Sequence, residues 1–149
     1  MKVAFIGVGY RGRQLLRLLQ HLPAFKVVAL ADPGLDDSGF PGIGCYNHGE
    51  DDYLNMLAEH APELVFVASP WQCHVRHALC CVERGCHVAL EIKGGLYIDE
   101  YRPLIELAHR RGCRVYPLEN TLFMRENLSV CNMVAAGLLG EIVYMRGGY

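Results

Sequence analysis

The chain has 149 residues, which is enough for one domain with a hydrophobic core. Its net charge is −2 and it has no basic stripe, so we expect no nucleic-acid partner. No apolar run is long enough to cross a bilayer, so we also expect no membrane partner. Met1 and Lys2 lead directly into the first predicted strand, so we expect no signal peptide.

Hydrophobic periodicity predicts strands and helices that alternate along the chain. In chain order, we predict strand 3–7, helix 11–22, strand 25–31, a glycine-rich loop over 33–49, helix 51–60, strand 64–68, helix 74–84, strand 87–91, helix 98–111, strand 114–118, helix 125–136 and strand 141–146. Short connections between alternating elements are typical of the α/β class. The pattern therefore predicts a doubly wound parallel sheet, the Rossmann fold, with right-handed crossovers.

The seven cysteines are scattered, and several fall within predicted helices or strands. An odd, scattered set is typical of reduced thiols, so we predict a cytoplasmic location. His74, His77 and Cys81 lie at helical spacing, but the chain lacks a paired C-x-x-C motif. We therefore predict no metal site.

Three glycines follow the first predicted strand in a G-x-G-x-x-G pattern: Gly7, Gly9 and Gly12. Gly7 allows a tight turn, Gly9 lets the backbone approach a pyrophosphate, and Gly12 lets the helix pack close to the sheet. The N-terminus of that helix offers free N–H groups to phosphates. The pattern in this context favours a dinucleotide site over a glycine turn in some other α/β domain.

Asp32 ends the second predicted strand, 20 residues beyond Gly12. A carboxylate there can accept hydrogen bonds from an adenosine ribose, whereas a 2′-phosphate would meet like charge. No Arg or Lys follows Asp32 closely, so the sequence favours NAD over NADP. The alternative is that Asp32 only caps the end of the strand.

Ligands of doubly wound sheets bind beyond the carboxyl ends of the strands. Polar groups follow three strands there, in the segments 69–74, 91–95 and 119–120. With these segments, the chain resembles the N-terminal domain of the Gfo/Idh/MocA oxidoreductases. The resemblance implies NAD(P) binding on residues 1–120, with residues 121–149 leading into a substrate and oligomerisation domain largely absent from this chain. It also implies a carbohydrate substrate and a homo-oligomer.

The segment after strand 87–91 departs from the common family pattern. Many members carry Glu-Lys-Pro there, with a catalytic lysine. In this chain Glu91 matches the glutamate, Ile92 stands at the lysine position and Lys93 at the proline position. Lys93 remains a catalytic candidate only if the loop shifts by one residue, and the sequence leaves this open.

The chain is most similar to one branch of this superfamily, glycoside hydrolase family 109. That branch shares an arginine inside the glycine motif, matched by Arg11, and an apolar residue after the strand glutamate, matched by Ile92. It also shares Pro-Trp-x-x-His, matched by residues 70–74, Leu-Glu-Asn, matched by 118–120, and Gly-x-Tyr, matched by 147–149. The resemblance implies catalytic roles for Glu119 and Tyr149. Together, the motif and the resemblance assign cofactor contact to Gly7, Gly9, Tyr10, Arg11, Gly12, Asp32, Ser69, Trp71, His74, Glu91, Ile92 and Asn120.

Enzymes of that branch use NAD without consuming it. The resemblance implies that a sugar C3 hydroxyl is oxidised, the C2 proton is removed, the aglycone is eliminated, water adds and the hydride returns. Such hydrolysis is a known exception to the two-carboxylate scheme. Two alternatives stay open, namely a net sugar or polyol dehydrogenase and a non-catalytic NAD-sensing protein. We expect residues 1–149 alone to bind NAD without turning over a sugar.

Overall fold

The computed structural model describes residues 1–92 and 97–148. These residues form two compact units, Met1–Leu118 and the part of the chain from Glu119 onward. The first unit contains the sheet and its covering helices. The second contains helix α5 (Arg125–Ala135), preceded by a short 3₁₀ turn at Thr121–Phe123. No helix in the described ranges is long and apolar enough to cross a membrane.

The first unit is built on a parallel sheet of six strands within the described residues. The strands are β1 (Lys2–Ile6), β2 (Lys26–Ala31), β3 (Gly44–Tyr46), β4 (Leu64–Val67), β5 (His87–Leu90) and β6 (Val115–Pro117). Their order in the sheet is β3-β2-β1-β4-β5-β6, and every neighbouring pair is parallel. The predicted doubly wound parallel sheet is confirmed.

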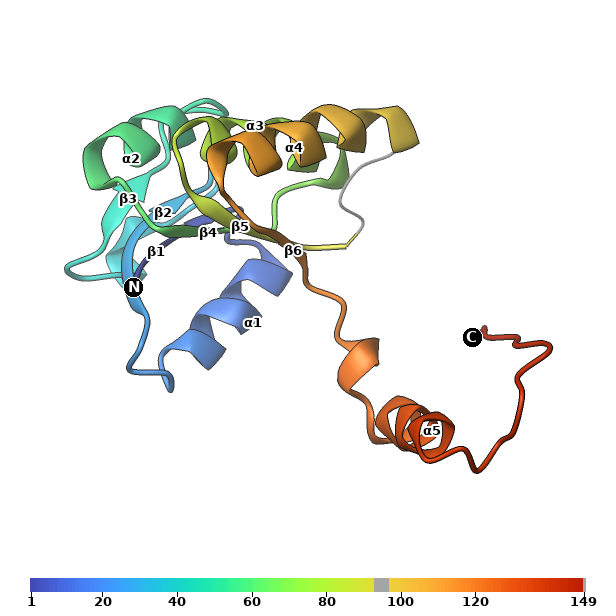
Figure 1. Cartoon of the computed structure of the whole chain (residues 1–149). Helices are drawn as coiled ribbons and strands as arrows, with labels where there is room; N and C mark the ends of the chain where they lie inside the picture. The colour runs from blue at the N-terminus through green and yellow to red at the C-terminus, as the bar shows by residue number, and fades with distance from the viewer. Residues whose placement is uncertain (93–96, 149) are drawn as a thin grey trace. The chain divides into compact units, whose positions relative to one another are not determined.

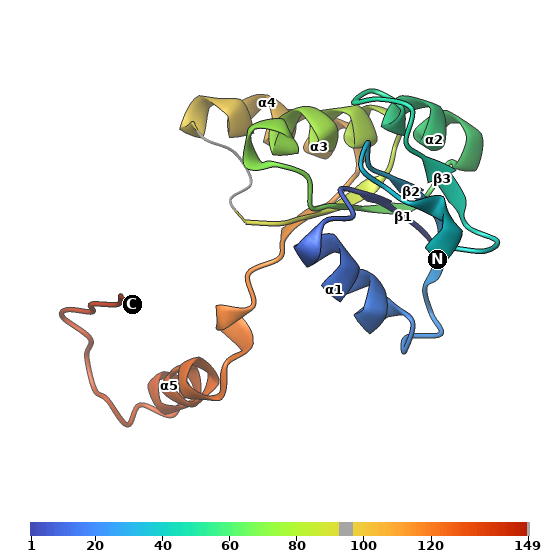
Figure 2. The ribbon, with the colours of Figure 1, turned by 180° about the vertical axis from the view of Figure 1, so that it is seen from behind.

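Helices cover both faces of this sheet. Helix α1 (Tyr10–Leu19) lies on one face, whereas α2 (Tyr53–His60), α3 (His74–Glu83) and α4 (Ile98–Arg111) lie on the other (Figures 1 and 2). Each face has its own apolar core, in which buried residues such as Leu16 of α1 or Met56 of α2 pack against alternating strand residues. Strands buried on both faces explain why the sequence reads as near-continuous apolar runs.

The strand order places the topological switch point of the sheet between β1 and β4. Chain connections leave β1 in one direction, toward β2 and β3, and return through α2 to β4 on its other side. Doubly wound sheets bind ligands at such a switch point, beyond the carboxyl ends of the strands.

Two predictions about secondary structure are wrong. Residues 44–46 were expected in a loop but form β3, which pairs with β2 through Ala29↔Gly44. Residues 141–146 were expected as a strand, yet no strand occurs in the described residues beyond β6. Ile142 and Val143 are exposed and find no neighbouring strand to pair with among the described residues.

Candidate functional site

The turn after β1 requires glycine at two positions. Gly7 has φ +90°, and a Cβ there would lie 2.4 Å from the backbone nitrogen of Ser69. A Cβ on Gly12 would lie 2.2 Å from the carbonyl oxygen of Gly7. The first glycine thus lets β1 turn against the end of β4, and the other lets α1 pack on that turn.

Gly9 differs from its two neighbours in the motif because the space around it is open. Gly9 precedes α1 with extended backbone angles, and a Cβ there would meet no protein atom within 4 Å among the described residues. The first turn of α1 contains no acidic residue. Free N–H groups and the positive end of the helix dipole therefore face a space that can hold an anion.

The carboxylate of Asp32 holds two turns together. Its Oδ2 accepts a hydrogen bond from the Val8 backbone N–H at 2.7 Å, and its Oδ1 accepts one from Gly34 N–H at 2.8 Å. A carboxylate has about four acceptor sites, so two of them are left for a ligand. Asp32 therefore acts as a strand-end cap and also lines the cavity described next.

A cavity of about 540 Å³ lies at the carboxyl ends of β1, β2 and β4. Four predicted cofactor residues line it, namely Gly7, Gly9, Asp32 and Ser69. Its volume lies within the range of small-molecule sites. Both the acceptor groups of Asp32 and the open space at Gly9 fit one dinucleotide, with a ribose near the first and a pyrophosphate near the second.

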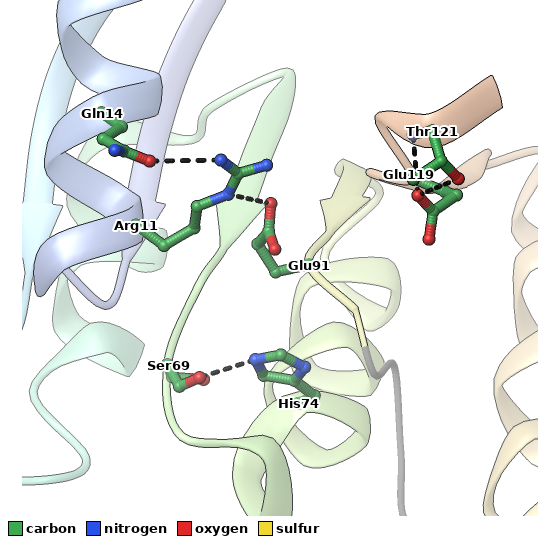
Figure 3. Close-up of polar contacts among 7 residues, drawn as sticks. All are labelled: Arg11, Gln14, Ser69, His74, Glu91, Glu119 and Thr121. Atoms are coloured by element: carbon green, nitrogen blue, oxygen red, sulfur yellow. Dashed lines mark hydrogen bonds and ion pairs between the residues drawn. The ribbon is translucent and has the colours of Figure 1, made fainter. Parts of the chain in front are cut away.

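Two buried histidines brace the loop between β4 and α3. His74 Nε2 lies 2.6 Å from the Ser69 carbonyl oxygen (Figure 3), and His77 Nδ1 lies 2.9 Å from the Ser69 hydroxyl. Burial, followed by the nearby charge of Arg76, lowers the pKa of His77 to about 4. At neutral pH His77 is therefore uncharged, and its Nδ1 accepts a hydrogen bond from the Ser69 hydroxyl whenever Nε2 carries the ring hydrogen.

Arg11 and Glu91 come from distant parts of the chain and form an ion pair. Arg11 Nε donates to Glu91 Oε1 at 2.9 Å, and Arg11 Nη1 donates to Gln14 Oε1 at 3.2 Å (Figure 3). The Glu91 side chain is 9% exposed, whereas that of Arg11 is 41% exposed. The pair joins the first turn of α1 to the end of β5.

Besides Gly9, three predicted cofactor residues of the first unit are solvent-exposed. Tyr10 begins α1, Trp71 begins a 3₁₀ turn at Trp71–Cys73, and Ile92 follows Glu91. Two predicted catalytic residues, Lys93 and Tyr149, lie outside the described residues.

Glu119 and Asn120 belong to the second unit. Glu119 Oε1 accepts hydrogen bonds from the Thr121 hydroxyl at 2.7 Å and the Thr121 backbone N–H at 2.8 Å (Figure 3). These bonds lower the pKa of Glu119, so it is a carboxylate at neutral pH. Asn120 precedes the 3₁₀ turn, where its carbonyl accepts the Phe123 N–H at 3.1 Å.

The cavity also has lining residues that the sequence motifs did not include. Tyr53 of α2, together with Cys73, Arg76 and His77 around the start of α3, forms its wall on the helix side. Cys73, Arg76 and His77 follow helical i, i+3, i+4 spacing, a signal that could have found them. No cluster of three or more potential metal-ligating residues occurs among the described residues.

Comparison with known proteins identifies the domain. The model of the Gfo/Idh/MocA family, described as an oxidoreductase family with an NAD-binding Rossmann fold, matches residues 1–118. The chain belongs to the Gfo/Idh/MocA family. It is thus an NAD-binding Rossmann domain of an oxidoreductase family, as the glycine motif and Asp32 predict.

Curated relatives extend this similarity over the whole chain. A glycosyl hydrolase family 109 protein of Saccharopolyspora erythraea is 31% identical over all of this chain and 35% of its own length. One from Shewanella pealeana is 30% identical over the same shares. The chain therefore spans about a third of the length of the curated relatives it matches.

Solved structures share the fold. Myo-inositol 2-dehydrogenase from Lactobacillus plantarum superposes with a TM-score of 0.83 at 21% identity, covering 99% of this chain and 44% of that protein. The WlbA dehydrogenase from Bordetella pertussis, solved with NADH and UDP-GlcNAcA, gives 0.84 at 16% identity, covering 95% of this chain and 43% of that protein.

Proposed function

We propose that this domain binds NAD for an enzyme that removes a hydride from a carbohydrate and returns it, so that a glycoside is hydrolysed without net oxidation. The ion pair between Arg11 and Glu91 carries the proposal. Both belong to motifs that the chain shares with glycoside hydrolase family 109, and the structure brings them into contact. The 31% identity to a protein of that name over the whole chain supports the same function.

In this proposal, residues of the first unit bind the cofactor. The open backbone at Gly9 and the N-terminus of α1 receive the pyrophosphate, and the free acceptor sites of Asp32 receive the adenosine ribose. The bound cofactor supplies a hydride acceptor that later returns the hydride. His74 is a positioning residue, because its 2.6 Å contact holds the Ser69 carbonyl in the loop beside the cavity.

We propose that the Arg11–Glu91 ion pair fixes the conformation of the protein beside the nicotinamide. The carboxylate of Glu91 is almost enclosed and gains a charge-assisted hydrogen bond from Arg11. With Ile92 at the position of the family's usual lysine, this branch lacks a lysine there to exchange a proton with a sugar hydroxyl. The proton steps then fall to other residues, and Tyr149 is proposed here for the removal of the C2 proton.

Glu119 is better suited to accept hydrogen bonds than to donate a proton. Its two bonds from Thr121 lower its pKa and stabilise the carboxylate. The efficiency of a general base falls as its pKa falls, and an ionised carboxylate is no general acid. We therefore propose that Glu119 accepts a hydrogen bond from a sugar hydroxyl, whereas Tyr149, as its phenolate, takes the C2 proton and becomes the neutral phenol.

The test uses the whole protein purified with its bound cofactor and a panel of chromogenic glycosides, with no NAD added. The proposal predicts aglycone release over many turnovers without accumulation of NADH, which is followed by its absorbance at about 340 nm. A net dehydrogenase would instead accumulate NADH from free sugars once NAD is supplied. A protein whose nicotinamide absorbance responds to no carbohydrate would be a sensor rather than an enzyme.

A further inference from the structure

The helix-side wall of the cavity contains a cation that the motifs do not account for. Arg76, in the first turn of α3, lines the cavity beside Tyr53 and His77. Its guanidinium pairs with Asp51, which precedes α2. The Arg76 side chain is 52% exposed, so it is open to a ligand as well as to its partner.

The position of this wall indicates which half of a dinucleotide it meets. Gly9 and Asp32 line the cavity, whereas Glu91 does not. The cavity therefore lies on the β2 side of the switch point between β1 and β4. With the pyrophosphate at Gly9 and a ribose at Asp32, the base attached to that ribose continues toward α2 and α3. This step rests on the NAD site proposed above.

Arg76 is restrained before any ligand arrives. Asp51 pairs with the guanidinium, and the Tyr53 hydroxyl also interacts with it. These two neighbours, Tyr53 first, raise the pKa of Arg76. Tyr53 is itself fixed, because its ring packs on His77 with centroids 4.5 Å apart and its hydroxyl donates to Cys80 Sγ at 3.5 Å. A restrained planar cation loses less entropy on binding.

We propose that Arg76 is a nucleobase-binding residue of the dinucleotide site, with its guanidinium plane stacked on the adenine ring. Guanidinium groups are planar and weakly hydrated, and they stack on aromatic faces. Asp51 balances the charge of Arg76, while Asp32 and Glu50 add negative charge to the same cavity. A neutral base fits this wall better than the 2′-phosphate of NADP.

The test is calorimetric titration of the 149-residue chain with NAD, ADP-ribose and NADP. Arg76→Ala is expected to weaken the binding of all three by a similar factor, about tenfold. Arg76→Lys keeps the positive charge beside Asp51 but loses the planar guanidinium group, so it should weaken binding nearly as much as Arg76→Ala does. Arg84→Ala is the matched control, since Arg84 caps the far end of α3 through the Cys80 carbonyl. Thermal melts check that each variant is folded.

Unchanged NAD and ADP-ribose affinity in folded Arg76→Ala would overturn the proposal. A loss confined to NADP would also overturn it, because Arg76 would then be a phosphate-binding residue. Full binding by Arg76→Lys would show that charge, not stacking, matters. If the wild-type chain bound none of the three ligands, the proposed NAD site itself would fail, whereas a normal wild type with an unaffected Arg76→Ala variant would refute only the role of Arg76.

Discussion

Gly12→Ala sets two physical effects against each other. Alanine inside a helix is favoured over glycine by about 1 kcal/mol, so propensity alone predicts a more stable protein. The structure predicts the opposite, because the new Cβ would lie 2.2 Å from the Gly7 carbonyl oxygen. That neighbour is backbone in a turn held by the hydrogen bond from Gly7 N–H to the Ala31 carbonyl, so α1 must move away from the sheet. Overpacking of this kind costs about 1–3 kcal/mol, and a backbone clash belongs at the upper end.

We expect a net loss of about 2 kcal/mol for Gly12→Ala, which lowers the melting temperature by roughly 8 °C in a domain of this size. Differential scanning calorimetry or urea denaturation measures it. Gly9→Ala is the matched control: its Cβ meets open space, so stability should change by less than about 0.5 kcal/mol while NAD binding weakens at least about tenfold. A Gly12→Ala variant more stable than wild type would refute this reasoning.

Three further substitutions test the charges of the site. Asp32→Asn removes the like charge that faces a 2′-phosphate, so the NADP-to-NAD affinity ratio should rise about tenfold in fluorescence titrations. Because burial lowers the pKa of His77 to about 4, folding favours its neutral form, and stability should fall as the pH drops from about 6.5 to about 4. His77→Gln should flatten that slope in urea denaturation, and an unchanged slope would contradict the assignment. Glu91→Gln weakens the bond from Arg11 and should lower the free energy of unfolding by about 1 kcal/mol.

The sheet was predictable because buried parallel strands leave a local signal. The apolar runs of the first unit, such as 64–68, coincide with observed strands. The strand β3 left no such signal. It has three residues, begins at Gly44 and forms only by pairing with Ala29 and its neighbours, which is a tertiary event. Its composition alone favours a loop.

The strand predicted at 141–146 does not form, which shows that a local apolar pattern is not sufficient for a strand. Ile142, Val143 and Tyr144 favour extended backbone, but a strand also needs a partner for its N–H and C=O groups. The described residues offer none, and these side chains are exposed.

The candidate site was predictable where a motif fixes both sequence and geometry. The spacing of Gly7, Gly9 and Gly12 is such a case, since each has a distinct steric environment. The contact of Arg11 with Glu91 could not be foreseen, because it depends on how α1 sits over β5. Likewise, Tyr53 faces the cavity because α2 packs beside α3, which its own sequence does not specify.

In the proposed reaction, a hydride leaves the sugar and later returns to it. The most direct measurement is turnover by the whole protein of a glycoside with deuterium at C3, in ordinary water, with mass spectrometry of the released sugar. We predict that the deuterium stays on C3 through many turnovers, and that in heavy water the unlabelled substrate gains solvent deuterium at C2. A released sugar with no C2 exchange, or a label transferred irreversibly to the nicotinamide, would contradict the account.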